Sequence, residues 1–302
     1  IAVELSDSEA KVLQVSKAKK KDLSIEQAFS VDLSDLSTEE EGVIERGARL
    51  REALKKNKIQ PTTCGLIIPK QNTILRTVQL PSSDPDELSE MAQFEAEKYI
   101  PFNTERHIIS NAVLAADDVE GSHVLISAVD GPVMDKALAV LKEAKLEPGV
   151  AEVSSVSLVR AFTEYEHEAL EQPAIVILNI GRSQADFTIL KNGLLIAARS
   201  TSLGVDQLNR SIARQAEKQD SPELGDATEK ALQSWINRIV RFTAQTYDFA
   251  AREYGVSTTS CLYVSGEGTE IEGLTQALAE SLGVEVKIFD PASRVSRVEN
   301  GQ

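Results

Sequence analysis

Two copies of a strand, turn, strand pattern divide the chain into halves. The first reads VELSDSEAKVL, from Val3 to Leu13, and the second reads LNIGRSQADFTI, from Leu178 to Ile189. In register, Glu4 falls on Asn179. Each copy opens one half of the chain and is followed by further strands and helices. The position of the two copies therefore indicates a chain made of two related halves.

Composition limits the classes of protein to which the chain can belong. Its 302 residues are 42% hydrophobic, enough to bury a large core in about two folding units. A formal charge of -15 argues against a nucleic-acid partner and against docking on anionic lipid. The two cysteines, Cys64 and Cys261, stand in apolar runs and indicate no disulfide framework. With no bilayer-length apolar stretch and no signal peptide, we expect a cytoplasmic protein.

The segment between the two copies predicts strands first and then an inserted α+β unit. After IAVEL and AKVLQV comes a charged stretch, then a helix around EEEGVIERGARLREALKK and the strands CGLIIP and TILRTVQL. A helix is expected from Asp84, with Pro85 at its first position, Glu87 completing a capping box and Pro101 ending it. The strands NAVLA and HVLISAV, a helix from Pro132 and a closing EPGV complete the insert.

The second half repeats the strand-rich opening. Three successive strands are predicted from AIVIL, ADFTIL and LLIAAR. A polar segment follows, and from Thr228 onward its apolar residues recur at helical spacing, which predicts a long helix. LYVSGEGTEIEGL predicts a strand, a glycine turn and a helix start, and VEVKIF a final strand. From Pro291 onward the hydrophobic residues show no strong periodicity, so we expect a fraying tail.

These features together resemble a known superfamily. The duplicated strand-turn-strand loops and the late glycine turn are similar to the actin-like ATPase fold, that of actin, hexokinase and the division protein FtsA. More narrowly, IPKQNTILRTVQLP, ELSEMAQFEAEKYIPF and LYVSGEGTEIEGLTQALAESLGVEV resemble the PilM family of type IV pilus assembly. The likeness runs from about Gly65 to Val286, and EAEKYIPF, Glu95 to Phe102, is its most specific part.

The resemblance implies a duplicated actin-like, ribonuclease H-like α/β fold with an inserted α+β subdomain. It places a nucleotide in a cleft between the halves. The implied boundaries are 1–79 with 149–172 for subdomain 1A, 80–148 for inserted subdomain 1C, 173–205 with 256–302 for subdomain 2A, and 206–255 for helical subdomain 2B.

The resemblance also implies ATP with Mg²⁺ as the ligand. The corresponding positions are Ser6, Asp7 and Ser8 in the first loop, Asn179, Gly181, Arg182 and Ser183 in the second, and Gly204, Gly266, Gly268 and Thr269, the last at the next helix start. Backbone amides of such turns hold phosphates, and a carboxylate after each first strand positions the metal.

Both loops depart from the family pattern. Glu4 stands where the family has Asp, and is the expected metal carboxylate, while Asn179 replaces the second Asp. Ser6 replaces a Gly, so a turn needing positive φ would be strained. Arg182 adds a cation beside the phosphate position. We therefore assign no catalytic residue, predict weak or no hydrolysis, and leave nucleotide binding open.

The partner implied by the resemblance is a PilN-like bitopic inner-membrane protein, contacted through its cytoplasmic segment. We expect Tyr99, Pro101 and Phe102 to bind it, with plain core packing as the alternative. The protein would then be peripheral to the inner membrane through that partner, without direct membrane insertion or nucleic acid, and a homo-oligomer is left open.

Three alternatives remain at this point. One is an FtsA-like polymerising division ATPase. FtsA relatives usually end in an amphipathic membrane-targeting helix, whereas SRVSRVENGQ offers only two valines. This difference counts against the alternative, unless the chain is truncated. A sugar or acetate kinase of the same superfold is disfavoured by Glu4 and Asn179, because such kinases need an intact metal-binding Asp. A cytoplasmic module of a type II secretion platform differs mainly in partner.

Overall fold

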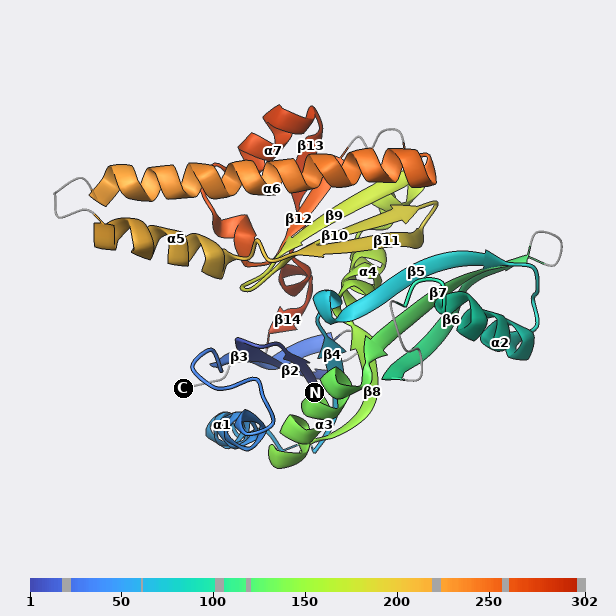
Figure 1. The fold of residues 1–302 in the computed structure, drawn as a ribbon, viewed down its shortest axis with the longest axis horizontal. Helices are drawn as coiled ribbons and strands as arrows, with labels where there is room; N and C mark the ends of the chain where they lie inside the picture. The colour runs from blue at the N-terminus through green and yellow to red at the C-terminus, as the bar shows by residue number, and fades with distance from the viewer. Residues whose placement is uncertain are drawn as a thin grey trace. The chain divides into compact units, whose positions relative to one another are not determined.

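The protein divides into two compact units, each with its own sheet and core (Figure 1). The computed structural model describes residues 1–17, 23–60, 62–100, 106–117, 121–218, 224–256 and 261–297. The first unit comprises Ile1–Arg160 and Pro291–Gln302, and the second comprises Ala161–Asp290. This α/β organisation, with a strand-turn-strand element at the start of each unit's sheet, matches the predicted fold class.

A six-stranded sheet in the order β14-β3-β2-β1-β4-β8 forms the centre of the first unit. Its strands are β1 (Ala2–Leu5), β2 (Glu9–Lys17), β3 (Leu23–Asp32), β4 (Thr63–Ile68), β8 (Glu147–Val153) and β14 (Ser296–Arg297). The first three form an antiparallel meander, whereas β4 and β8 run parallel to β1 and to each other. Alternate side chains such as Val3, Val12 and Leu66 are buried in one core.

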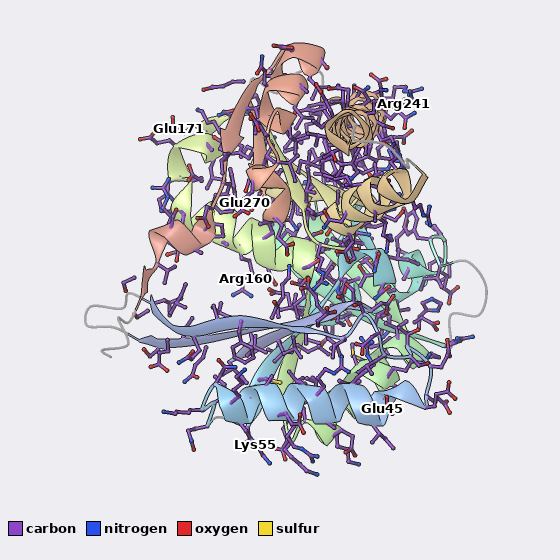
Figure 2. All side chains as sticks on the ribbon, turned by 90° about the vertical axis from the view of Figure 1, so that its left-hand side faces the viewer. Glu45, Lys55, Arg160, Glu171, Arg241 and Glu270 are labelled. Carbon is purple, nitrogen blue, oxygen red and sulfur yellow. The ribbon has the colours of Figure 1, made fainter. Side chains whose placement is uncertain are left out.

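Two helices pack together against this sheet. They are α1 (Gly42–Lys56) and α3 (Gly131–Glu143), whose residues Leu50 and Leu141 are fully buried in the same core. Figure 2 shows Glu45 and Lys55 toward opposite ends of α1, the order that complements the helix dipole. The helix α4 (Ser154–Tyr165) follows β8.

Three strands of this sheet lie outside the sequence prediction. The charged stretch after the second strand contains β3, and EPGV is not a closing turn but the start of β8. Proline is tolerated in β8 because this strand forms the edge of the sheet. The expected tail contains β14, which pairs with β3 and so belongs to the first unit rather than with residues 256–290.

The insert contains a three-stranded antiparallel sheet in the order β5-β7-β6, covered on one face by α2. Its elements are β5 (Thr73–Leu80), α2 (Pro85–Ala96), β6 (His107–Asp117) and β7 (Gly121–Asp130). The sheet thus begins at Thr73, earlier than residue 80, and α3 packs in the core of the six-stranded sheet. The short helix η1 (Lys70–Asn72) leads into β5.

The helix α2 begins as predicted, but not through a capping box. The carboxylate of Asp84 accepts the N–H groups of Asp86 and Glu87 at 2.9 and 3.1 Å. Glu87 instead accepts the hydroxyl of Ser82 at 2.7 Å, and that same hydroxyl accepts the N–H of Asp84 at 3.1 Å. The nearby serine therefore replaces the expected reciprocal bond.

The second unit is built on a five-stranded sheet in the order β11-β10-β9-β12-β13. The elements are η3 (His167–Glu171), β9 (Ala174–Ile180), β10 (Ala185–Lys191), β11 (Leu194–Thr201), α5 (Val205–Lys218), α6 (Leu224–Tyr254), β12 (Cys261–Ser265), η4 (Glu267–Glu270), α7 (Leu274–Leu282) and β13 (Glu285–Ile288). The long helix α6 buries Trp235, Ile236 and Ile239 against one face of the sheet. In Figure 1, α5 and α6 lie side by side. The chain then returns to the first unit through η5 (Pro291–Arg294).

Candidate functional site

The turn between β1 and β2 is closed by a serine side chain. The N–H of Ser6 donates to the Glu9 carbonyl at 2.9 Å, and the Ser6 hydroxyl both donates to that carbonyl and accepts the Glu9 N–H at 3.1 Å. The non-glycine residues with positive φ in the described chain are Lys58, Lys145 and Asn192. The expected strain at Ser6 was therefore wrong, because its hydroxyl helps to close the turn without a left-handed backbone.

Arg46 of α1 holds the same turn. Its guanidinium donates to the carbonyls of Ser6 at 2.6 Å, Asp7 at 3.0 Å and Leu33 at 3.3 Å. Arg46 is only 5% exposed, and this burial lowers the pKa of its guanidinium, while the charge of Asp7 opposes that shift. The carbonyl groups of the turn are thus engaged on the α1 side.

Glu4 and Ser8 flank this turn. Glu4 is half-buried in β1 and lies between Lys11 of β2 and Ile67 of β4 in the sheet register. The Ser8 hydroxyl is buried and has no hydrogen-bond partner among the described residues. A buried hydroxyl of this kind usually binds a water or a ligand oxygen, so Ser8 fits a polar ligand at the turn.

The turn between β9 and β10 is fastened to the start of α5. Gly181 donates its N–H to the Gln184 carbonyl at 2.9 Å. The N–H groups of Val205 and Asp206 donate to the carbonyls of Gly181 and Arg182 at 3.1 and 2.9 Å. These first N–H groups of α5 are therefore occupied by the turn.

Three glycines around this turn are explained by close packing. A Cβ at Gly204 would lie 2.3 Å from the Arg182 carbonyl oxygen. At Gly266, whose φ is +83°, it would lie 2.5 Å from the Ile180 carbonyl oxygen, and at Gly268 it would lie 2.5 Å from Ile180 Cβ. The absence of a side chain at these three positions therefore permits close packing within the second unit. Gly181 differs, because its Cβ would meet only ordinary contact at 3.6 Å.

Arg182 is paired within the second unit. Its Nε lies 3.3 Å from the Asp206 carboxylate, with both side chains about three-quarters buried. The cation expected beside the phosphate position is thus partly neutralised at the start of α5. Ser183 lies in the same turn and is half-buried.

Thr269 does not begin an α-helix. It lies inside η4, where its hydroxyl donates to the Gly266 carbonyl at 2.8 Å. The next helix, α7, begins five residues later at Leu274, after Gly273 in the left-handed conformation. The expected helix start at Thr269 was wrong because a short 3₁₀ turn intervenes.

Asp186 is a buried polar residue that the sequence did not reveal. It lies directly across the β9–β10 ladder from Asn179, and Ser200 and Ser265 continue the same row on the neighbouring strands. Asp186 is 2% exposed, and its carboxylate accepts the Ser200 hydroxyl at 2.6 Å and the Gln184 amide at 3.1 Å. A charged residue inside the apolar run ADFTIL was the signal that could have revealed it.

A groove of about 270 Å³ lies in the first unit, between the insert and the six-stranded sheet. The floor comes from β6 and β7 and one wall from β8. The lining residues include Ile108, Ser110, Ala112, Leu125, Ser127, Ala151, Glu152 and Val153. Both β6 and β8 are outer strands of their sheets. The groove is therefore apolar in large part, and its floor is a sheet face that ends at an outer strand, a surface along which an extended peptide fits.

Tyr99 lies apart from the residues that line this groove. Its hydroxyl donates to Glu95 at 3.3 Å, the Arg76 guanidinium lies 5.7 Å from its ring centre, and 38% of the side chain is exposed. Burial, with the neighbouring Glu95 charge, raises the pKa of Tyr99. Pro101 and Phe102 lie outside the described residues.

A family model described as type IV pilus assembly protein PilM matches residues 2–301. The chain belongs to the PilM family. Within the parts of this PilM-family chain that the structure describes, no helix is long and apolar enough to cross a membrane.

Solved structures agree with this assignment at the level of fold. The chain is similar to a structure of a PilM–PilN type IV pilus biogenesis complex, with a TM-score of 0.81 and 21% identity over 98% of this chain and 89% of that one. A Bacteroides thetaiotaomicron protein with an actin-like ATPase fold and unknown function matches at 0.50 and 12% identity over 96% and 90%. This PilM-family chain therefore has the actin-like fold.

A third similarity is more remote. The cytoplasmic domain of EpsL, an inner-membrane component of the Vibrio cholerae type II secretion system, matches with a TM-score of 0.46 and 13% identity over 93% of each chain.

Proposed function

We propose that this PilM-family chain is a cytoplasmic scaffold of a type IV pilus assembly platform, attached to the inner membrane through a PilN-like protein. Family membership over residues 2–301 supports the pilus role. The partner is proposed from the PilM–PilN complex, whose fold this chain shares. The observation that carries the binding role is the groove between β6 and β8 in the first unit.

An extended segment suits this groove for two reasons. Both β6 and β8 are the outer strands of their sheets, and an added strand forms hydrogen bonds with the unpaired main-chain groups of such a strand. Between them, Ile108, Leu125 and Val153 offer apolar contacts for alternate side chains of the segment. We therefore place the partner segment here. Tyr99, which lies apart from this groove, remains a prediction, as do Pro101 and Phe102.

A pair of variants on one strand tests this placement. Ser110 is an exposed residue of β6 that lines the groove, and Ala115 is exposed on the same strand outside the lining set. Ser110→Arg should weaken binding of a fluorescent peptide from the PilN-like cytoplasmic segment by about tenfold or more, because a charge would be buried in the groove. Ala115→Arg should leave affinity unchanged. Equal affinity in both variants would refute the placement, and no binding by the parent protein would refute the partner.

We also propose that the chain binds a nucleotide. The actin-like fold and the unpartnered Ser8 hydroxyl support it. In the second unit, Asn179 and Asp186 supply the hard oxygen atoms that Mg²⁺ prefers, with Ser200 and Ser265 in the same row. A bound Mg²⁺ would neutralise phosphate charge. Glu4 remains the predicted metal carboxylate of the first unit.

Calorimetric titration with ATP tests nucleotide binding independently of partner binding. Binding that strengthens when Mg²⁺ is added would support a metal-organised nucleotide. No heat with ATP, with or without Mg²⁺, would reject the nucleotide and leave the partner-binding scaffold intact, because the groove is formed by other residues.

A further inference from the structure

The first unit has a second cavity, of about 240 Å³, beside the turn at Ser6 and Asp7. Apolar side chains from α1, β4 and α3 form most of its wall. They include Val43, Leu66, Ile68, Met134, Ala137 and Val140. The volume is somewhat below the ~300–1,000 Å³ typical of pockets for drug-sized ligands, so a smaller molecule or a single side chain would fill it.

The contact between two helices borders this cavity. A Cβ at Gly47 of α1 would lie 2.3 Å from Glu143 Cβ and 2.8 Å from the Val140 carbonyl oxygen of α3. This close approach fixes α1 against α3. Val43 and Arg46, on α1 just before Gly47, line the cavity opposite residues of α3.

The cavity has a buried cation in its lining. Arg46 is 5% exposed, and three of its hydrogen bonds go to the neutral carbonyls of Ser6, Asp7 and Leu33. A guanidinium has five N–H donors, so two are left over. In the described chain no carboxylate lies at ion-pair distance from Arg46. A buried charge of this kind favours an anionic partner.

The other charged residues near the cavity do not pair with Arg46. Lys136 also lines the cavity, and its Nζ pairs with Glu39 at 3.2 Å at the surface. Asp7 is the lining carboxylate, but its side chain is exposed and influences Arg46 only at longer range. Arg46 is therefore the lining cation that has no carboxylate at ion-pair distance among the described residues.

We propose that this cavity binds an apolar carboxylate, with the Arg46 guanidinium receiving the carboxylate and the walls of α1, α3 and β4 enclosing the aliphatic body. A single planar guanidinium with two remaining donors matches a carboxylate, which accepts two parallel hydrogen bonds. The apolar majority of the wall excludes a heavily hydrated anion. This site uses residues different from those that define the partner groove, except Ile68 and Met134, which border both.

The carboxylate can belong to a free small molecule or to the end of a peptide chain, and two probes separate these sources. Isocaproate represents the free aliphatic acid, and acetyl-Gly-Leu represents a chain end. In calorimetric titration we expect at least one of them to bind with a dissociation constant on the order of 1 mM. The matched amide of the binding probe should bind about tenfold more weakly or not at all, because it lacks the charge.

Two variants on α3 separate this site from nonspecific binding. Ala137→Phe fills the cavity without altering Arg46 and should abolish binding of the probe. Leu138→Phe, at a neighbouring position that is 38% exposed and outside the lining, should leave it unchanged. Arg46→Met should also abolish binding, with its melting temperature measured because it removes three hydrogen bonds from the fold.

If Arg46→Met does not fold, the amide probes and the Ala137→Phe variant decide the question. The proposal is overturned if neither acid binds, if acid and amide bind equally, or if Ala137→Phe binds as the parent does. Arg46 would then serve only to hold the turn at Ser6.

Discussion

Asp186 lies directly opposite Asn179 in the β9–β10 ladder, so a carboxylate stands beside the amide at the position where the resemblance to the family implies an aspartate. Opposed residues of adjacent strands project on the same face of a sheet. The Asp186 carboxylate is held by the Ser200 hydroxyl and the Gln184 amide. The uncharged amide of Asn179 is therefore accompanied by a buried carboxylate on the neighbouring strand.

If the chain binds ATP as proposed, this relationship predicts how Mg²⁺ changes the affinity. Asp186→Asn keeps the size of the side chain but removes its charge, so we expect the Mg²⁺-dependent gain in ATP affinity to fall by about tenfold, or about 1.4 kcal/mol. Calorimetry with and without Mg²⁺ measures it. Asp248→Asn, an exposed change on α6, is the matched control and should have no effect. An unchanged Mg²⁺ response in Asp186→Asn would remove this residue from the proposed site.

Two glycine substitutions should differ in their effect on stability. Gly204→Ala would place a Cβ 2.3–2.4 Å from backbone atoms of the Arg182 to Gln184 turn, and should cost about 3 kcal/mol in the free energy of unfolding. Gly181→Ala meets an atom only at 3.6 Å and should change that energy by about 1 kcal/mol or less. Urea unfolding compares them. Similar losses in both variants would show that the packing around Gly204 is misassigned.

The raised pKa of Tyr263 predicts that the second unit loses stability at alkaline pH. It is 4% exposed in β12 and contacts Phe162 at a ring-centre distance of 4.7 Å. Burial, together with the nearby Cys261 and Glu166, raises the pKa of Tyr263 from 10.0 to about 12. The unfolded chain therefore loses this proton at lower pH than the folded protein. The stability that depends on the neutral phenol is present below pH ~10 and is lost as the pH rises toward ~12.

Tyr263→Phe isolates this contribution. The variant cannot ionise at this position, so its free energy of unfolding should fall less steeply than that of the parent between pH ~10 and ~12. Tyr165→Phe serves as a control and should retain the parent slope. Identical slopes in all three proteins would show that Tyr263 titrates normally.

The elements with a clear hydrophobic period could be predicted from the sequence, and the exceptions have physical causes. Strands β9 and β10 are almost wholly buried, so their apolar runs are unambiguous. The edge strand β8 contains Pro148 and Gly149, which indicate a turn when the sheet around them is unknown. The two-residue strand β14 depends on pairing with β3, far away in the chain, and has no local signal.

The candidate site was predictable in its loops but not in its contacts. The repeat located the turns at Ser6 and Gly181, yet the reason for the glycines at 204 and 268 is the proximity of the β9–β10 turn and of Ile180. Arg46 was missed because it reaches the first turn from a helix separated from it by two strands. Contacts of this kind follow from tertiary packing rather than from motif spacing.

The proposed partner groove is tested most directly by hydrogen exchange with and without the PilN-like cytoplasmic peptide. An added strand would pair with outward-facing N–H groups of β6 or β8, so amide exchange should slow in His107–Asp117 or Glu147–Val153. The account predicts protection centred on these edges and little change in α2. Protection confined to α2 and Tyr99, with both edges unchanged, would contradict it.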